Sequence, residues 1–323
     1  MDILQYQSDF LSYLESQKIT RDPKNLYEPI DYILQLGGKR IRPILTLIAS
    51  HIFCGEYKDA LPAALAVEVF HNFTLVHDDI MDDAPLRRGH KTVHEKWDIN
   101  TGILSGDAML ILAYQYFENY PPTVFQKLAQ LFSKTALEVC DGQQLDVDFE
   151  TRNDVTIEEY IKMITLKTSV LVAAALKMGA IVAEADETEA QHLYNYGLNL
   201  GIAFQLQDDY LDTFGDPKTF GKQVGGDIIE NKKTFLYLKS LEVANKEDQK
   251  KLYTLYNEEQ KNISEKIKAV SSIFERNNIP KHTHELIGYY TDKSFESLDL
   301  LNISNQAKEG LRLFGKNLMS RKV

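Results

Sequence analysis

Two groups of aspartates share the spacing D-D-x-x-D, each in an otherwise apolar stretch. The first is Asp78-Asp79-Ile80-Met81-Asp82, and the second is Asp208-Asp209-Tyr210-Leu211-Asp212. On a helix, residues four apart share a face, so the first and last aspartate of each group align and repel each other unless a cation lies between them. Carboxylates suit hard cations, and Mg2+ usually combines one or two of them with substrate phosphate oxygens. The two groups therefore predict a divalent metal and a diphosphate substrate.

Basic residues accompany both aspartate groups. The glycine pair at 37–38 opens a turn ahead of a helix, where backbone N–H groups and side chains can approach an anion together. This turn carries Lys39, Arg40 and Arg42, of which we expect Arg40 to be structural or at the surface. Lys167 lies in an otherwise apolar helix, which predicts a paired or ligand-facing role. Further cations follow the aspartate groups at Arg87, Arg88, Lys222 and Lys232.

Long helices must position these residues. The 323 residues include only 9 Pro and 17 Gly, and apolar residues recur at three- and four-residue spacing almost throughout. The sequence lacks alternating strand blocks joined by hairpin turns. We expect the first aspartate group to end a helix that starts at 59–62, the second to end a helix over 188–212, and Lys167 to lie in a central apolar helix over 156–183. The pattern predicts an all-α fold, with residues 1–323 in a single domain.

Charge and cysteine content narrow the partners and the compartment. A formal net charge of -11 disfavours nucleic acids and anionic membranes as partners. We find no apolar stretch of about 18 residues and therefore predict no membrane span. The first residues lack the basic-then-apolar form of a signal peptide. Cys54 and Cys140 are too few for a disulfide framework, so we expect buried thiols in a cytoplasmic protein.

The motifs, in their order along the chain, resemble those of the trans-isoprenyl diphosphate synthase (polyprenyl synthetase) family, and in particular its short-chain members. The resemblance rests on residues 37–43, 78–89, 106–107, 167–168, 204–212, 221–222 and 226–232. It implies an all-α bundle or barrel of long helices around a deep central cavity, usually as a homodimer. It also implies a prenyltransferase that condenses isopentenyl diphosphate with an allylic diphosphate, which could be dimethylallyl, geranyl or farnesyl diphosphate.

The resemblance also implies roles for individual residues. Metal ligands for Mg2+, with Mn2+ as an alternative, would be Asp78, Asp82 and Asp208, supported by Asp79, Asp209 and Asp212. Contacts to the allylic diphosphate would come from Arg87, Lys167, Gln205 and Lys222, with Lys232 or its neighbour Lys233 as a further contact. The isopentenyl diphosphate site would consist of Lys39, Arg42, His71 and Arg88. Thr168 and Gln205 would face the developing carbocation, which makes Arg87, Lys167, Thr168 and Gln205 the candidate catalytic residues.

Two phenylalanines before the first aspartate group are candidates for the floor that limits product length. Phe73 lies five residues before Asp78, or about 7.5 Å along a helix, and Phe70 lies about one turn further. In the family that the chain resembles, a bulky residue at the Phe73 position limits chain growth. Thr74 is small, and the first group lacks the two-residue insertion typical of bacterial farnesyl synthases. We therefore predict a product of C15 to C20 and leave the exact length and primer open.

Three other functions are open to the sequence. A class I terpene cyclase shares the first aspartate motif, but its second motif normally contains Asn and Ser or Thr. A di-iron carboxylate bundle would use Glu-x-x-His pairs, which occur at 68–71 and 189–192, yet it leaves both aspartate groups unexplained. A non-catalytic partner subunit of a synthase should have degraded aspartate groups, and here both are intact.

Overall fold

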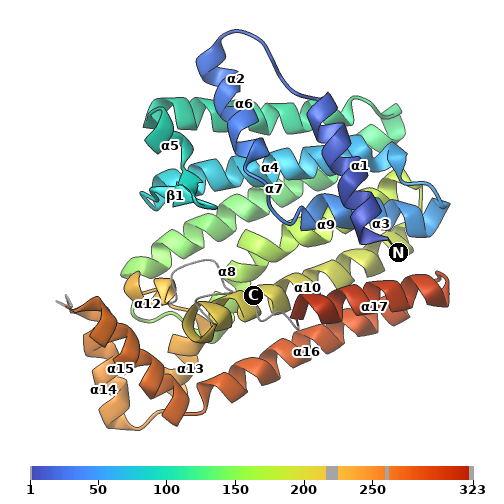
Figure 1. Ribbon diagram of the computed structural model, residues 1–323. Coiled ribbons are helices and arrows are strands. Elements are labelled where there is room, and N and C mark those ends of the chain that lie inside the picture. Colours follow the sequence, from blue (N-terminus) through green and yellow to red (C-terminus); the bar gives the residue numbers. More distant parts are fainter. Residues whose placement is uncertain (1, 216–224, 259–261, 320–323) are drawn as a thin grey trace. The chain divides into compact units, whose positions relative to one another are not determined.

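The computed structural model describes residues 2–215, 225–258 and 262–319, and Lys222 lies outside these ranges. The described chain is almost entirely helical (Figure 1), which confirms the predicted all-α class. In chain order its elements are α1 (Ile3–Ser16), α2 (Lys24–Gln35), α3 (Ile41–Cys54), η1 (Lys58–Ala60), α4 (Leu61–Met81), β1 (Leu86–Arg87), β2 (His90–Lys91), α5 (Val93–Lys96), α6 (Ile99–Phe117), α7 (Pro122–Thr151), α8 (Ile157–Ile164), η2 (Thr165–Ser169), α9 (Val170–Val182), α10 (Glu187–Phe214), α12 (Gly226–Ile229), α13 (Phe235–Val243), α14 (Lys246–Asn257), α15 (Ile263–Arg276), α16 (Ile279–Asp299) and α17 (Asn305–Met319).

The chain forms two compact units. Unit 1 comprises Met1–Lys134 and Ala174–Leu193, and unit 2 comprises Thr135–Ala173 and Tyr194–Val323. Three helices, α7, α9 and α10, have residues in both units. We keep the single domain over 1–323 as a proposal because these helices continue unbroken across the boundaries. The deep central cavity likewise stays a prediction.

Unit 1 is built on α4, which packs most extensively against α6 (Figure 1). Pro62 lies in the first turn of α4, where its missing N–H leaves no hydrogen bond unmade. The following turns, Ala63 to Phe70, are wholly buried. At Gly106 of α6, an added Cβ would lie 2.2 Å from Nε2 of His77 on α4. The glycine therefore leaves room for the His77 ring between the two helices, and the first aspartate group follows directly after His77.

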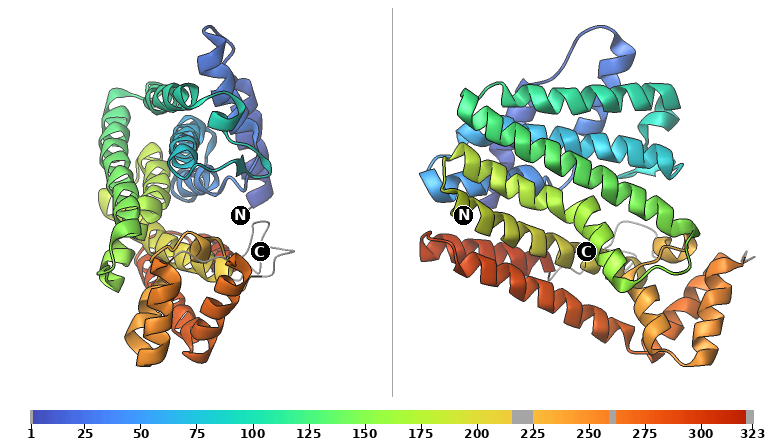
Figure 2. Two further views of the ribbon diagram at one scale, coloured as in Figure 1. Left: turned by 90° about the vertical axis from the view of Figure 1, so that its left-hand side faces the viewer. Right: turned by 180° about the vertical axis from the view of Figure 1, so that it is seen from behind.

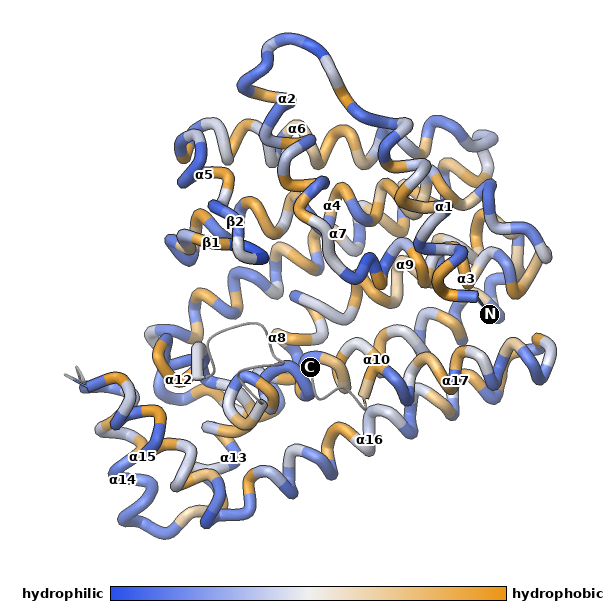
Figure 3. Tube along the Cα trace, viewed as in Figure 1, coloured by the Kyte–Doolittle hydropathy of each residue, from blue (hydrophilic) through white to orange (hydrophobic). Residues whose placement is uncertain are grey.

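In unit 2, α8 packs against α13 (Figure 2). Helix α13 also contacts α14, α15 and α16, and α17 lies beside α16. Helix α8 begins with a capping box in which Thr156 and Glu159 bond each other's backbone N–H, and this satisfies two donors at the helix start. The apolar core includes Phe149, Tyr160 and Ile164. Apolar residues dominate α9, whereas α14 is largely hydrophilic (Figure 3), as expected of a core and a surface helix.

One continuous helical stretch, Ile157–Val182, is long and apolar enough to cross a membrane, and 72% of its most apolar window is buried. It is not an uninterrupted apolar run of the kind that the sequence was expected to lack, because Lys162, Lys167 and Lys177 lie within it. A buried core helix passes the same test, so the stretch is weak evidence for a membrane span.

The two cysteines differ from the expectation in one respect. Both are free thiols, as predicted, but both are exposed rather than buried. Cys54 is the last residue of α3, directly before Gly55, and its Sγ donates to the carbonyl oxygens of Ser50 and Glu56. The prediction of buried thiols rested on residue type, which does not show that Cys54 lies at an exposed helix end.

Candidate active site

The predicted isopentenyl diphosphate residues lie in unit 1 and are brought together from three elements. Nη1 of Arg42, in the first turn of α3, lies 3.1 Å from Nε2 of His71 on α4. Arg88, in the turn between β1 and β2, donates to the carbonyl oxygen of Gly37. Lys39 is exposed in the same glycine turn. The fold therefore brings His71, 29 residues after Arg42, and Arg88, 51 residues after Gly37, to the turn that carries Lys39 and Arg42.

The ring of His71 is neutral. Burial, followed by the charge of Arg42 and Arg88, holds the pKa of His71 well below its usual value of 6.5. Because a guanidinium has no acceptor, Nε2 of His71 accepts from Arg42 and Nδ1 carries the proton. The imidazole therefore orients Arg42 without adding a positive charge.

The first aspartate group lies at the C-terminal end of α4, with Asp82 as the C-cap. Asp79 is only 1% exposed and accepts hydrogen bonds from Nε of Arg87 at 2.8 Å, while Nη2 of Arg87 lies 2.7 Å from the same carboxylate. This bidentate contact holds the guanidinium in one orientation. Asp78 is half-buried and Asp82 is exposed. Asp79 therefore holds the side chain of Arg87 in position.

The second aspartate group ends α10 in unit 2 and joins a buried network. Asp209 accepts one hydrogen bond from the hydroxyl of Tyr160 at 2.6 Å and another from Nε2 of Gln205 at 2.8 Å. Oε1 of Gln205 accepts in turn from Oγ1 of Thr168 at 3.1 Å. Thr168 and Gln205, both predicted to face the carbocation, are therefore in direct contact. The network fixes which end of the Gln205 amide points toward Thr168.

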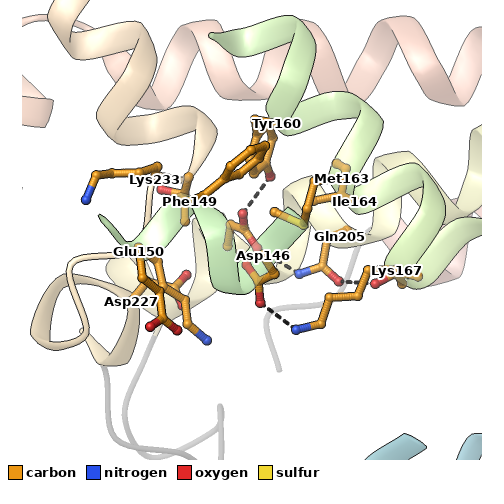
Figure 4. A pocket seen from close by; sticks show the side chains of 14 residues that line it. Asp146, Phe149, Glu150, Tyr160, Met163, Ile164, Lys167, Gln205, Asp227 and Lys233 are labelled. Carbon is orange, nitrogen blue, oxygen red and sulfur yellow. Dashed lines mark hydrogen bonds and ion pairs between the residues drawn. The ribbon is translucent and has the colours of Figure 1, made fainter. Parts of the chain in front are cut away.

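Lys167 and Thr168 lie in the π-helical turn η2, between α8 and α9. Single π-helical turns inside α-helices are frequent at functional sites. An added Cβ at Gly142 of α7 would lie 2.2 Å from the backbone nitrogen of Lys167, so only glycine allows α7 to approach this turn. Nζ of Lys167 is 2.6 Å from Oδ2 of Asp146, also on α7 (Figure 4).

Lys167, Thr168, Gln205 and Asp209 all line a pocket of about 100 Å³ in unit 2 (Figure 4). Its apolar wall is formed by Phe149, Met163 and Ile164 and its polar part by charged and hydroxyl side chains. The polar lining consists of Asp146, Glu150, Tyr160, Lys167, Thr168, Gln205, Asp209, Asp227, Lys232, Lys233 and Thr234. Both Lys232 and its rival Lys233 line the pocket, so both stay candidates for the further diphosphate contact.

Electrostatics in unit 2 favour a bound cation. Burial, and then the nearby Asp208 and Asp212, contribute to raising the pKa of Asp209 to about 6. Burial, with the charges of Asp209 and Asp212, raises the pKa of Asp227 well above its usual value. Burial works against the charge of Lys232, but Glu230 and Asp146 outweigh it and raise the pKa of this lysine. Burial is thus the main reason why both carboxyl groups resist ionisation, and the neighbouring carboxylates add to it.

The donor set fits a hard divalent cation. Both aspartate groups lie at helix C-termini, where the helix dipole already disfavours negative charge. Within residues 2–215, 225–258 and 262–319, no three His, Cys, Asp or Glu side chains are grouped to hold a metal by themselves. Carboxylate oxygens are nevertheless ligands that Mg2+ accepts, and this ion completes its shell with water and substrate phosphates.

The two candidate floor residues have different surroundings. Phe70 is buried and packs edge-on against Phe132 of α7. Phe73 is half-buried and contacts the rings of Phe70 and His77, with centroids 5.5 and 4.8 Å away. Phe70 therefore supports Phe73 from the core, and Phe73 is the more accessible of the two.

The Glu-x-x-His pair at 68–71 is engaged with cations rather than arranged as a metal ligand pair. Glu68 forms a buried ion pair with Arg40, and His71 contacts Arg42. Arg40 is therefore structural, as predicted.

Several residues of the pocket received no role from the sequence, among them Asp146, Tyr160 and Asp227. Asp227 lies in the segment 226–232 that resembles the family, which was a usable signal, but it was not assigned a role. Tyr160 lies in an apolar run and gives no sequence signal, because only the packing of α8 near α10 brings it to Asp209.

Comparisons with known proteins agree with this geometry. The polyprenyl synthetase family model matches residues 23–273. A short chain isoprenyl diphosphate synthase of Methanothermobacter thermautotrophicus is 36% identical, covering 99% of this chain and 98% of the relative. A geranylgeranyl diphosphate synthase of Saccharolobus solfataricus is 39% identical over 88% of this chain and 87% of the relative. A crystal structure of a geranylgeranyl pyrophosphate synthase is 53% identical, with a TM-score of 0.96 and full coverage of both chains.

These similarities favour the synthase over the cyclase, the di-iron bundle and the non-catalytic subunit. The family match spans the cationic turn, both aspartate groups and the segment that carries Lys232. The chain therefore belongs to the polyprenyl synthetase family, and within it to the short-chain trans-prenyl diphosphate synthases, which are prenyltransferases.

Proposed function

We propose that this enzyme condenses isopentenyl diphosphate with dimethylallyl, geranyl or farnesyl diphosphate to give a C15 to C20 product, with C20 geranylgeranyl diphosphate as the main one. The Thr168–Gln205–Asp209 network, in a pocket lined by Lys167 and Lys232, carries the proposal. The network connects Thr168 and Gln205, whose oxygen atoms can face a carbocation, with Asp209 of the second aspartate group, which is suited to a metal. The relatives named for a geranylgeranyl product support the C20 assignment.

The allylic diphosphate is assigned to Lys167, Lys232 and Arg87, with Lys222 as a further contact outside the described residues. The allylic C–O bond breaks and its electron pair leaves with the diphosphate, so cations fixed near the diphosphate oxygens lower the barrier. Asp146 and Asp79 hold Lys167 and Arg87 in place. Thr168 and Gln205 present oxygen atoms to the resulting cation, and the apolar wall of the pocket excludes water.

Isopentenyl diphosphate is assigned to Lys39, Arg42, His71 and Arg88. Three cations beside a neutral histidine, two of them held by hydrogen bonds, suit a group that carries a diphosphate but does not ionise. The double bond of isopentenyl diphosphate attacks the allylic cation and forms the new C–C bond. A proton is then lost, and we assign its acceptor to the released diphosphate.

Mg2+ is the proposed cofactor, and Asp78, Asp82 and Asp208 would hold it, with Asp79, Asp209 and Asp212 supporting them. When bound, it supplies positive charge to the diphosphate oxygens. Mn2+ accepts the same oxygen ligands.

A homodimer in the cytoplasm is also proposed. Helix α6 exposes Ile99, Ile103, Leu104 and Ile111, and exposed apolar patches commonly mark protein interfaces. The free thiols of Cys54 and Cys140 are typical of a reducing compartment.

The test is an incubation of purified protein with labelled isopentenyl diphosphate and each of the three primers, with and without Mg2+. Products are dephosphorylated and sized by chromatography. The proposal expects a metal-dependent linear alcohol, mainly C20. Folded protein that incorporates no label with any primer would refute it, and a product longer than C20 would refute the length assignment alone.

A further inference from the structure

A buried ion pair lies behind the cationic turn of unit 1. Arg40 is 4% exposed and Glu68 is 2% exposed. Nη1 of Arg40 donates to the carboxylate of Glu68 on α4, and Nη2 donates to the carbonyl oxygen of Leu34 in α2. One guanidinium therefore links the helix before the turn to the helix that carries His71.

The carboxylate of Glu68 is itself fixed. Nδ2 of Asn72, one turn along α4, donates to Oε1 of Glu68 at 3.0 Å and to its carbonyl oxygen at 2.8 Å. Asn72 is fully buried. Since residues three apart are neighbours on a helix surface, Glu68 and His71 lie on adjoining parts of the same face. The position of Arg40 is thus tied to that of His71.

The backbone around Arg40 has an unusual conformation. Arg40 has a φ of 50°, and Gly37 and Gly38 before it have φ values of 77° and 120°. A non-glycine residue in the left-handed region persists only where its surroundings hold it there. The contacts to Glu68 and Leu34 supply this restraint. Lys39 and Arg42, which flank Arg40, depend on the same backbone for their directions.

A contribution to stability does not by itself explain why an ion pair occupies this buried position. A buried salt bridge is often no more stabilising than apolar residues of similar volume. Arginine, however, can donate in two directions from a rigid planar group, and here the two directions reach α4 and α2. The ion pair is therefore better suited to fixing geometry than to raising stability.

We propose that Arg40, Glu68 and Asn72 are positioning residues for the diphosphate of isopentenyl diphosphate. They hold the glycine turn in the one conformation in which Lys39, Arg42 and His71 can bind the same anion. The proposal rests on the proposed function, because it presumes that this cationic turn binds isopentenyl diphosphate.

The test measures KM separately for isopentenyl diphosphate and for the allylic primer. Arg40→Lys keeps the charge but loses the second direction of donation. Glu68→Gln keeps the shape but leaves Arg40 without a counter-charge. Because Lys39, Arg42 and His71 would no longer be held at the spacing of one diphosphate, each variant should raise KM for isopentenyl diphosphate about tenfold or more. KM for the allylic primer should change less than about threefold, within the scatter of such effects.

An apolar double variant, Arg40→Met with Glu68→Leu, separates positioning from stability. It removes both charges together, so its melting temperature should stay near that of the wild type. The proposal predicts a raised KM for isopentenyl diphosphate even so. Tyr57→Phe is the matched control, because it removes a 2.6 Å hydrogen bond to Asp9 elsewhere in unit 1 and should leave both KM values unchanged.

A stable double variant with wild-type KM for isopentenyl diphosphate would overturn the proposal. So would single variants in which both KM values rise together in proportion to the fall in melting temperature. If a variant fails to fold, binding of isopentenyl diphosphate to Arg40→Lys, measured by calorimetry without primer, decides the question: unchanged affinity overturns the proposal. Wild-type protein that incorporates no isopentenyl diphosphate would instead refute the proposed function.

Discussion

Gln205 donates a hydrogen bond from Nε2 to Oδ1 of Asp209, one helical turn along α10, at a distance of 2.8 Å. With the amide nitrogen directed to the carboxylate, Oε1 is left to face Thr168, which donates to it. One residue thus connects an aspartate of the proposed metal site to the proposed carbocation site. A shift of Asp209 would therefore also move Gln205 and Thr168, beside which the allylic cation is proposed to form.

Gln205→Glu should damage catalysis while leaving the fold intact. The variant replaces the donor to Asp209 by a second negative charge at i,i+4 spacing, which is repulsive. We expect kcat/KM for the allylic primer to fall about a hundredfold, since the lost bond involves a charged group. Gln144→Glu is the control, because Gln144 makes the same kind of bond to Asp148 at 2.8 Å on the surface of α7. Similar losses in both variants would contradict the role of Gln205.

Tyr160→Phe should raise the Mg2+ concentration needed for half-maximal activity. The change removes a 2.6 Å hydrogen bond to Asp209 from a fully buried ring and should lower the free energy of unfolding by about 1–3 kcal/mol. Tyr196→Phe removes another buried hydroxyl bond in unit 2, to the carbonyl of Leu311. It should destabilise the protein similarly but leave the Mg2+ dependence unchanged. An unaltered Mg2+ dependence in Tyr160→Phe would exclude Asp209 from the support of the metal.

Phe73→Ala should lengthen the product by at least one isoprene unit. Phe73 is the half-buried member of the pair, and Phe70 lies behind it in the aromatic core. Removing the ring opens space for further growth. The measurement is the size distribution of the dephosphorylated products, with Phe53→Ala as a truncation of another half-buried phenylalanine of unit 1. An unchanged distribution would show that Phe73 is not the floor.

His71 should make stability depend on pH between neutral and mildly acidic conditions. Its folded pKa is held below the usual value near 6.5 by burial and by Arg42 and Arg88, so the unfolded chain takes up the proton first as the pH falls. The stabilisation is present above about pH 6.5 and is lost below it. Urea unfolding at pH 5, 6 and 7 should show a shallower decline for His71→Gln than for the wild type. The control is His282→Gln, which changes a partly exposed histidine far from Arg42 in the sequence. Equal pH dependence of the unfolding free energy in wild type, His71→Gln and this control would contradict the assignment.

Much of the fold could be predicted because its signals are local. Helix α4 covers Leu61–Met81, as predicted for a helix that starts at 59–62 and carries the first aspartate group at its end, and α10 covers Glu187–Phe214, where a helix over 188–212 was predicted. The spacing of Asp208 and Asp212 predicted a shared helix face, and both lie in α10. Composition and periodicity were sufficient for these features because capping and amphipathic spacing are properties of short segments.

Other features depend on packing between distant segments, which one sequence does not reveal. The contact of Arg87 with Asp79, the π-helical turn at Lys167 and the hydroxyl of Tyr160 on Asp209 all arise from tertiary contacts. The exposed positions of Cys54 and Cys140 were missed for the same reason, since residue type says little about which side of a helix faces solvent. These buried partners are what turn a set of motifs into fixed geometry.

The central claim is that Arg42 serves isopentenyl diphosphate and Lys167 serves the allylic diphosphate. The most direct test compares Arg42→Gln and Lys167→Gln by steady-state kinetics with each substrate varied in turn. The account predicts a crossed pattern: Arg42→Gln raises KM for isopentenyl diphosphate by about tenfold or more, and Lys167→Gln does so for the allylic primer. If both variants raise KM for the same substrate, or each affects the substrate assigned to the other, the assignment of the two diphosphate sites is wrong.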